Sequence, residues 1–210
     1  MKTIGIILRE FNASYKNVKL YGIRCDLIEY LRNYNVNVIS IPVIFDDTDN
    51  EFEKVKSVIE MCDGIIFPGG IKCFELDCKI MKYCYEIDKP TLGLCLGMQI
   101  MGKTFDGCIK CLGNESHNKD EKYVHKVKIN KNSKLYKILE KDEILVNSRH
   151  NNFVQRTSLV CSAISDDGVI EAVEDDSRKF FMSFQWHPES LQDDKNSKKI
   201  FDYFLEKINN

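Results

Sequence analysis

Three residues of this sequence, Cys95, His187 and Glu189, are of types that can carry out nucleophilic catalysis together. Cys95 lies in the run TLGLCLGMQ (residues 91–99), with one glycine two positions before it and another two positions after it. His187 and Glu189 lie in the run FQWHPE (residues 184–189). A thiolate is a strong nucleophile, histidine is the usual base beside it, and a carboxylate can orient that base.

The residues around Cys95 indicate a nucleophile elbow, in which a strand turns sharply into a helix. An apolar strand pattern ends before Cys95, and a helical pattern starts directly after it. Such a turn brings backbone segments so close that glycine is required at 93 and 97. The sulfur would then lie at a helix N-terminus, whose positive end favours a thiolate. Taken alone, the segment is equally compatible with two packing glycines around an inert thiol.

His187 and Glu189 are two positions apart, so in extended backbone their side chains would project to the same side. Pro188 would stiffen the pair by fixing its own φ angle. A lone histidine would more simply be structural, but beside Cys95 the pair favours a Cys-His-Glu triad. The long separation along the chain is no obstacle, because triad members meet in space.

The sequence also contains candidates for an oxyanion hole. Attack on a carbonyl places negative charge on its oxygen, which two backbone N–H groups can stabilise. In an elbow one donor is the residue after the nucleophile, here Leu96. The loop Pro68-Gly69-Gly70 would supply the second donor from Gly70, with a plain turn as the alternative.

The first half of the chain alternates short apolar runs with helical periodicity, which predicts a parallel sheet covered by helices on both faces. The expected strands are 3–8, 35–41, 64–67 and 91–94, and the expected helices are 21–34, 52–59, 76–85 and 97–105. The second half predicts antiparallel strands and one closing helix. These strands are 123–129, 160–164, 169–173 and 179–184, the helix is 196–208, and the polar stretch 111–122 is expected to be an exposed loop.

Composition favours one α/β domain over residues 1–210. The chain has 210 residues, 43% of them hydrophobic, and 30 Lys and Arg against 32 Asp and Glu, a net charge of −2. The charge balance argues against nucleic-acid binding, and no apolar run is long enough to span a bilayer. With no export signal at its start, the chain is expected in the cytoplasm.

The nine cysteines do not form a recognisable framework. Their number is odd, and in a reducing compartment they are expected to be free. Cys108 and Cys111 form a single C-x2-C without a second pair, so no metal site is expected. The eight cysteines other than Cys95 are interpreted as packing or surface thiols.

The motifs together resemble the class I glutamine amidotransferase family. GLCLGMQ (93–99), WHPE (186–189) and FPGG (67–70) occur in that family's order, and the resemblance runs nearly end to end. It implies a flavodoxin-like, three-layer fold with a mostly parallel central sheet, helices on both faces and antiparallel strands in the second half.

The resemblance also implies roles for individual residues. Cys95, His187 and Glu189 would be nucleophile, base and orienter, and Gly70 and Leu96 the oxyanion donors. Gly69 and Gln99 would contact the substrate, Gln99 by holding its γ-glutamyl group.

Two more segments resemble the γ-glutamyl-γ-aminobutyrate hydrolase branch, peptidase C26. They are VNSRH (146–150) and YVHKV (123–127). The first implies that Ser148, Arg149 and His150 contact the amino-acid end of the substrate. His125 is expected to be exposed and not catalytic, and His117 to be solvated.

The sequence departs from this branch around the pocket. Only residues 71–94 separate Gly70 from Cys95, where the branch has a long insertion, and Asn151 and Asn152 replace its second histidine and glutamine. The departures leave the identity of the amine leaving group open.

Three functions fit the sequence. The first is a stand-alone hydrolase that cleaves a γ-glutamyl amide through a thioester, needs no cofactor and releases glutamate. The second is a glutaminase subunit that delivers ammonia to a separate synthase, since 210 residues would leave no room for a fused one. The third, a binding protein without turnover, gives no reason for the three reactive residues to occur together. The oligomeric state stays open.

Overall fold

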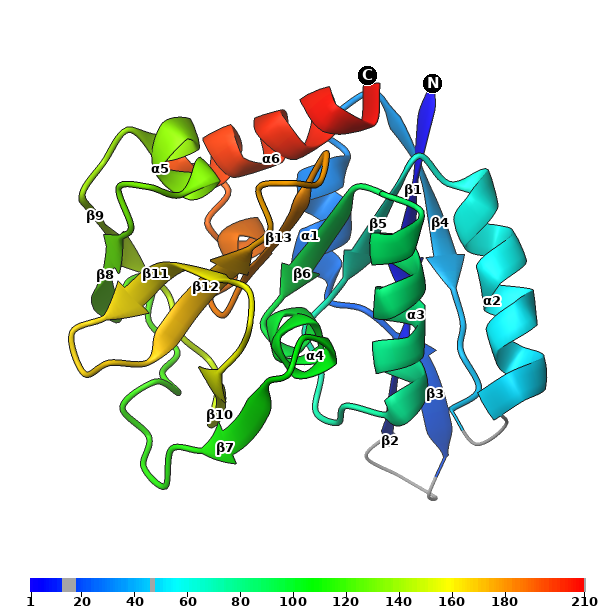
Figure 1. The fold of residues 1–210 in the computed structure, drawn as a ribbon, viewed down its shortest axis with the longest axis horizontal. Helices are drawn as coiled ribbons and strands as arrows, with labels where there is room; N and C mark the ends of the chain where they lie inside the picture. Colours follow the sequence, from blue (N-terminus) through cyan, green and yellow to red (C-terminus); the bar gives the residue numbers. More distant parts are fainter. Residues whose placement is uncertain (13–17, 46–47, 210) are drawn as a thin grey trace.

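A nine-stranded mixed sheet forms the centre of the protein (Figure 1). The computed structural model describes residues 1–12, 18–45 and 48–209. The strand order is β4-β1-β5-β6-β13-β12-β11-β8-β9. Helices cover both faces, so the expected three-layer α/β class is confirmed.

One half of the sheet is parallel. Its strands are β4 (Val36–Ile41), β1 (Lys2–Ile7), β5 (Gly64–Phe67), β6 (Thr91–Leu94) and β13 (Phe181–Phe184). Every residue of β5, β6 and β13 is buried. This accounts for their continuous apolar sequences, because strands covered on both faces need no polar alternation.

The other half is antiparallel and follows β13 across the sheet. Its strands are β12 (Ile170–Glu174), β11 (Val160–Ser165), β8 (His125–Ile129) and β9 (Glu143–Val146). Residues 179–184 were expected to form an antiparallel strand, which is correct for one neighbour of β13 and wrong for the other. β13 is antiparallel to β12 but parallel to β6, and so joins the two halves.

The helices form two layers around separate cores. In Figure 1, α2 (Thr48–Met61), α3 (Glu75–Glu86) and α4 (Leu96–Thr104) lie on the near face of the sheet. The helices α1 (Cys25–Leu31) and α6 (Lys195–Asn209) pack on the other face. Successive residues of β5 alternate between the two cores, Ile66 in one and Ile65 and Phe67 in the other, as the strand repeat requires.

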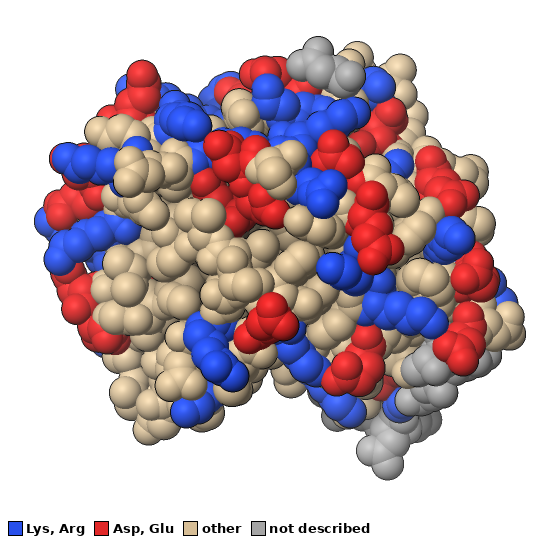
Figure 2. Space-filling view, in the orientation of Figure 1, with Lys and Arg blue, Asp and Glu red and all other residues tan. Residues whose placement is uncertain are grey.

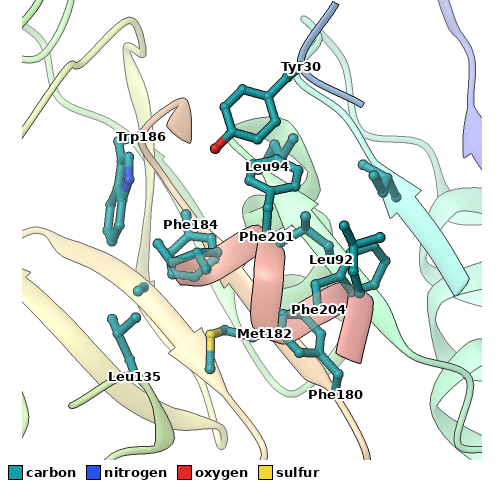
Figure 3. Packing of buried hydrophobic residues seen from close by; sticks show 14 of the residues in the cluster. Tyr30, Leu92, Leu94, Leu135, Phe180, Met182, Phe184, Trp186, Phe201 and Phe204 are labelled. Carbon is teal, nitrogen blue, oxygen red and sulfur yellow. The ribbon is translucent and has the colours of Figure 1, made fainter. Parts of the chain in front are cut away.

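Aromatic side chains fill the core beneath α1 and α6 (Figure 3). The rings of Tyr30 and Phe201 are 4.5 Å apart, centre to centre, and those of Phe184 and Trp186 are 4.7 Å apart. Phe184 and Trp186 are fully or nearly fully buried, so they fix the end of β13 directly before His187.

Several elements differ from the sequence-based expectations. The helix expected over 21–34 is shorter, because residues 21 and 22 end β3 (Lys19–Gly22), which pairs with β2 (Arg9–Asn12) in a hairpin. The helix α5 (Lys134–Leu139), the strand β9 and the pair β7 (Cys108–Cys111) and β10 (Asn152–Arg156) were not predicted. The strands are short, and their pairing partners are distant in sequence.

The face shown in Figure 2 carries basic and acidic side chains intermixed. Among the described residues, no helix combines the length and apolar character needed to cross a membrane.

Candidate active site

Cys95 lies at the turn between β6 and α4, in the backbone conformation of an elbow. Its φ is 50° and its ψ is −98°, a left-handed conformation that non-glycine residues rarely adopt. Such strain costs about 1–3 kcal/mol and persists only where the surroundings impose it. The Cys95 amide donates a 2.7 Å hydrogen bond to the carbonyl of Phe184, which ties the turn to β13.

The two flanking glycines are required by close packing. A Cβ atom at Gly97 would lie 2.1 Å from the carbonyl oxygen of Phe67. A Cβ atom at Gly93 would lie 2.8 Å from the carbonyl carbon of Gly97 and 2.7 Å from Cβ of Ser183. Side chains at these positions would push the helix, β5 and β13 apart.

Three neighbouring parallel strands bring the candidate residues to one edge of the sheet. Phe67 of β5 pairs with Gly93 of β6, and Leu94 of β6 pairs with Phe184 of β13. The Gly69-Gly70 loop, Cys95 and His187 follow the ends of these strands. Open α/β sheets bind ligands at this carboxyl edge.

His187 and Glu189 form a buried pair. Nδ1 of His187 is 2.6 Å from Oε1 of Glu189, and the two residues are 4% and 2% exposed. The expectation that extended backbone would align them was wrong, because Glu189 lies in a 3₁₀ turn, η1 (Pro188–Ser190). The pair forms because this turn folds the glutamate back toward the imidazole.

His187 also lies close to Cys95 and the glycine loop. A Cβ atom at Gly69 would be 2.9 Å from Cε1 of His187 and 3.7 Å from Cβ of Cys95. Burial alone would lower the pKa of His187, but Glu189 and Cys95 outweigh this effect and raise it to about 10. The environment therefore favours a protonated imidazole between the carboxylate and the sulfur.

The two predicted oxyanion donors are neighbours. A Cβ atom at Gly70 would lie 2.7 Å from Cδ2 of Leu96. Leu96 is the first residue of α4, where backbone N–H groups have no acceptor within the helix. Gly70 and Leu96 remain predicted donors, and the contact between Gly70 and the Leu96 side chain is compatible with that role.

Two glutamines lie behind the sulfur. The amide of Gln185 donates to Sγ of Cys95 at 3.6 Å. Gln99 donates to the carbonyl of Asn152 at 2.9 Å and lies 3.4 Å from Oε1 of Gln185. Gln185 was not singled out from sequence, although it lies in the same motif as His187. Gln99, a predicted substrate contact, here bonds to protein groups.

Asn147 holds the backbone of His187 and was also not singled out. Its side-chain oxygen accepts from the His187 amide and its side-chain nitrogen donates to the His187 carbonyl, both at 2.8 Å. Asn147 is 2% exposed. Asn147 belongs to the VNSRH motif, so the sequence does point to this segment. The role of Asn147 could not be inferred from the motif, because it depends on a contact with a residue 40 positions away.

The three predicted substrate contacts that follow Asn147 lie in different surroundings. Arg149 donates to Oγ of Ser190 at 2.5 Å, and with Asn147 and Ser190 it lines an open cavity of about 410 Å³ beside the His187–Glu189 pair. Ser148 is fully buried and donates to the carbonyl of His117. His150 is buried and lies near the carbonyl of Asn152 and the carboxylate of Glu171.

His117 is not solvated, contrary to the sequence-based expectation. It is 2% exposed, although it lies in a polar loop. The side chain of His125 is only 18% exposed. Both turn toward the buried Glu171, so the loop folds inward over β8 and β12.

The comparisons with known proteins agree on the family to which the chain is similar. The peptidase C26 family model matches residues 74–189, a span that includes Cys95, His187 and Glu189. A putative glutamine amidotransferase-like protein of Lactococcus lactis, YvdE, is 27% identical, covering 97% of this chain and 98% of its own. The Rickettsia prowazekii protein RP404, with the same description, is 25% identical, covering 81% and 85%.

Larger relatives and solved structures match as well. The CTP synthase of Lactobacillus helveticus is 25% identical over 84% of this chain, which corresponds to 39% of that enzyme. The glutaminase domain of Trypanosoma brucei CTP synthase has a TM-score of 0.76 at 17% identity, and a putative GMP synthase subunit from Thermoplasma acidophilum has 0.73 at 19%. Each covers 100% of this chain and 94% of its own, which establishes the shared fold.

Proposed function

This chain belongs to the peptidase C26 family of glutamine amidotransferase-like proteins, and we propose that it is a cysteine hydrolase that cleaves γ-glutamyl amide bonds. The buried contact of His187 with Glu189, next to the strained Cys95, carries the proposal. A packing role for a thiol would not require a left-handed backbone and an adjacent histidine-carboxylate pair.

In the first half of the reaction, the Cys95 thiolate attacks the δ-carbonyl carbon of the substrate. The carbonyl electrons move to oxygen, where the N–H groups of Gly70 and Leu96 would stabilise the negative charge. As the intermediate collapses, the C–N bond breaks and protonated His187 donates its proton to the departing amine. A γ-glutamyl thioester on Cys95 remains.

In the second half, water replaces the amine. Neutral His187 takes a proton from the water, whose oxygen attacks the thioester carbonyl. The C–S bond breaks, glutamate leaves, and the thiolate and protonated His187 are restored. Glu189 keeps the imidazole oriented and stabilises its positive charge in both halves.

The similarity to CTP synthases supports a second candidate, a glutaminase subunit that delivers ammonia to a separate synthase. The matching part of the Lactobacillus helveticus enzyme is 39% of that protein. The same residues would act, but glutamine hydrolysis would stay slow until the partner docks.

Glutamate release from glutamine and from a panel of γ-glutamyl amines, with purified protein alone, distinguishes the candidates. Turnover of a γ-glutamyl amine that is lost in Cys95→Ala and kept in Cys161→Ala supports the hydrolase. Weak glutamine hydrolysis that rises sharply with cell extract supports the second candidate. No turnover in either condition, with wild type and Cys95→Ala alike, contradicts both candidates and leaves a binding protein.

A further inference from the structure

Four side chains outside the candidate active site converge in the antiparallel half of the protein. Oε1 of Glu171 lies 3.1 Å from Nδ1 of His117, 3.3 Å from Nε2 of His125 and 3.6 Å from Nε2 of His150. Glu171 is fully buried, and His117 and His150 are 2% and 5% exposed. Three of the four histidines of the chain therefore surround one buried carboxylate.

Five buried polar atoms of this cluster have no hydrogen-bond partner. They are both carboxylate oxygens of Glu171, Nδ1 of His117 and Nε2 of His125 and of His150. The short contacts to Glu171 thus lack the geometry of hydrogen bonds. Buried polar groups without partners are costly, and several around one point are typical of an ion-binding site.

We propose that His117, His125, His150 and Glu171 bind one divalent transition-metal ion, with Zn²⁺ the best match. Zinc bonds to histidine nitrogen and carboxylate oxygen at about 2.0–2.2 Å, so neighbouring ligand atoms of a tetrahedral site are about 3.4 Å apart. The three distances to Glu171 lie around this value. The ligand atoms of His117, His125 and Glu171 all lie within 4.8 Å of one another.

The ligand types discriminate among metals. Three imidazole nitrogens suit zinc and other late first-row metals, whereas Mg²⁺ and Ca²⁺ prefer oxygen ligands. His117, His125 and Glu171 form a compact three-ligand group, and His150, outside this group but 3.6 Å from Glu171, would complete the four protein ligands typical of a structural zinc site.

Outer contacts orient two of the histidines as metal ligands require. Nε2 of His117 lies 2.9 Å from Oδ2 of Asp167, and Nδ1 of His150 lies 3.0 Å from the carbonyl oxygen of Asn152. In each ring the second nitrogen is the one that faces Glu171. Such outer partners fix the tautomer of a ligating histidine and increase its basicity. The carboxylates of Glu171 and Asp167 together balance the two positive charges of the ion.

The proposed ion would join three segments that support the catalytic pair. The loop with His117 pairs with residues 148–150 through the amides of Lys119 and His150, and Asn147, directly before these residues, holds the backbone of His187. The carbonyl of Glu171 accepts from the amide of Gln185, which lies behind Cys95. The metal is thus assigned a structural role beside the active site, with no part in the chemical step.

The test is zinc binding to the full chain after treatment with a chelator and removal of the chelator. Titration calorimetry with zinc chloride is expected to give one ion per chain. The thermal midpoint should rise by about 5–10 °C at a free zinc concentration about one hundred times the Kd. No binding by the folded wild-type protein overturns the proposal.

The zinc affinity of single-residue variants tests which side chains bind the ion. Glu171→Gln and His125→Ala should weaken zinc binding more than about 100-fold, and Asp167→Asn, an outer contact, by about 10- to 100-fold. His187→Ala and Cys95→Ser should bind as the wild type does. Full binding in His125→Ala, or loss of binding in His187→Ala or Cys95→Ser, contradicts the proposed ligands.

A cobalt spectrum tests the site without any substitution. Co²⁺ bound in place of zinc should give the intense visible bands of tetrahedral coordination and no thiolate-to-cobalt charge transfer. Thiolate bands would place the ion on cysteines, and weak octahedral bands would indicate a site made mainly of water; either result overturns the proposal.

Discussion

At the residue scale, the proposed chemistry depends on how His187 is held. Glu189 bonds to one ring nitrogen, and Asn147 bonds to the backbone amide and carbonyl of His187. Cys95 and His187 both lie next to Gly69. The imidazole is therefore constrained by side-chain and backbone contacts that come from separate parts of the chain.

The loss of activity after substitution of Cys95, His187 or Glu189 should depend on the role proposed for each residue. Cys95→Ser and His187→Ala remove the proposed nucleophile and the proposed proton carrier. Each should therefore lower kcat at least about 100-fold more than Glu189→Gln, which removes only the proposed orientation and charge. Steady-state glutamate release measures the ranking, with Cys161→Ala as the control. Equal losses in all three variants would mean that Glu189 does more than orient the base.

Asn147→Ala should lower kcat about 100-fold with little change in KM. The substitution removes two buried hydrogen bonds to the His187 backbone and lets the imidazole shift, and a shift of about 1 Å can cost that much. Asn147→Asp, which keeps the acceptor for the His187 amide, should be less affected. Asn151→Ala, a change at an exposed neighbour, is the control, and equal effects of the two alanine variants would contradict a positioning role.

The raised pKa of His187 predicts a pH-dependent contribution to stability. The folded value is about 10, and an unfolded histidine titrates near about 6.5. The contribution is fully present below the unfolded pKa and is lost as the pH rises through the folded pKa. The difference in unfolding free energy between wild type and His187→Ala, measured in urea, should therefore shrink from pH 6.5 to 10. A constant difference across this window would argue against the protonated imidazole.

At the element scale, the elbow was predictable and the support around it was not. Gly93, Cys95 and Gly97 are recognisable because their steric requirement is local: strand, turn and helix are contiguous in sequence. Glu189 was placed correctly beside His187 but through the wrong backbone, since one proline allows both an extended and a 3₁₀ conformation. His117 was misjudged because its burial depends on a loop that folds over β8 and β12, and no local pattern encodes such a contact.

Substitution of the elbow glycine tests the packing directly. Gly97→Ala should destabilise the protein by more than about 3 kcal/mol, because its Cβ would lie 2.1 Å from a backbone oxygen. Gly113→Ala is the matched control, since no atom lies within 4 Å of its Cβ position and its φ is +72°; only about 1–2 kcal/mol of backbone strain is expected there. Urea unfolding curves give both values, and similar losses would contradict the steric explanation.

At the scale of the whole molecule, the candidate site lies where the two halves of the sheet meet. β13 lies between parallel β6 and antiparallel β12, so Cys95 and His187 follow adjacent parallel strands, while the proposed metal cluster lies on the antiparallel side. The fold class follows from the alternation of strand and helix periods in the first half. The position of β13 between β6 and β12 does not follow from the sequence, because its continuous apolar run is compatible with either strand as a neighbour.

Trapping of the acyl-enzyme tests the central claim most directly. Wild-type protein mixed with a turned-over γ-glutamyl substrate, quenched in acid and digested, should carry one γ-glutamyl group on the peptide that contains Cys95. Mass spectrometry should find no such adduct in Cys95→Ala, which should also release no glutamate. Glutamate release by Cys95→Ala at the wild-type rate, or an adduct on another residue, would contradict Cys95 as the nucleophile.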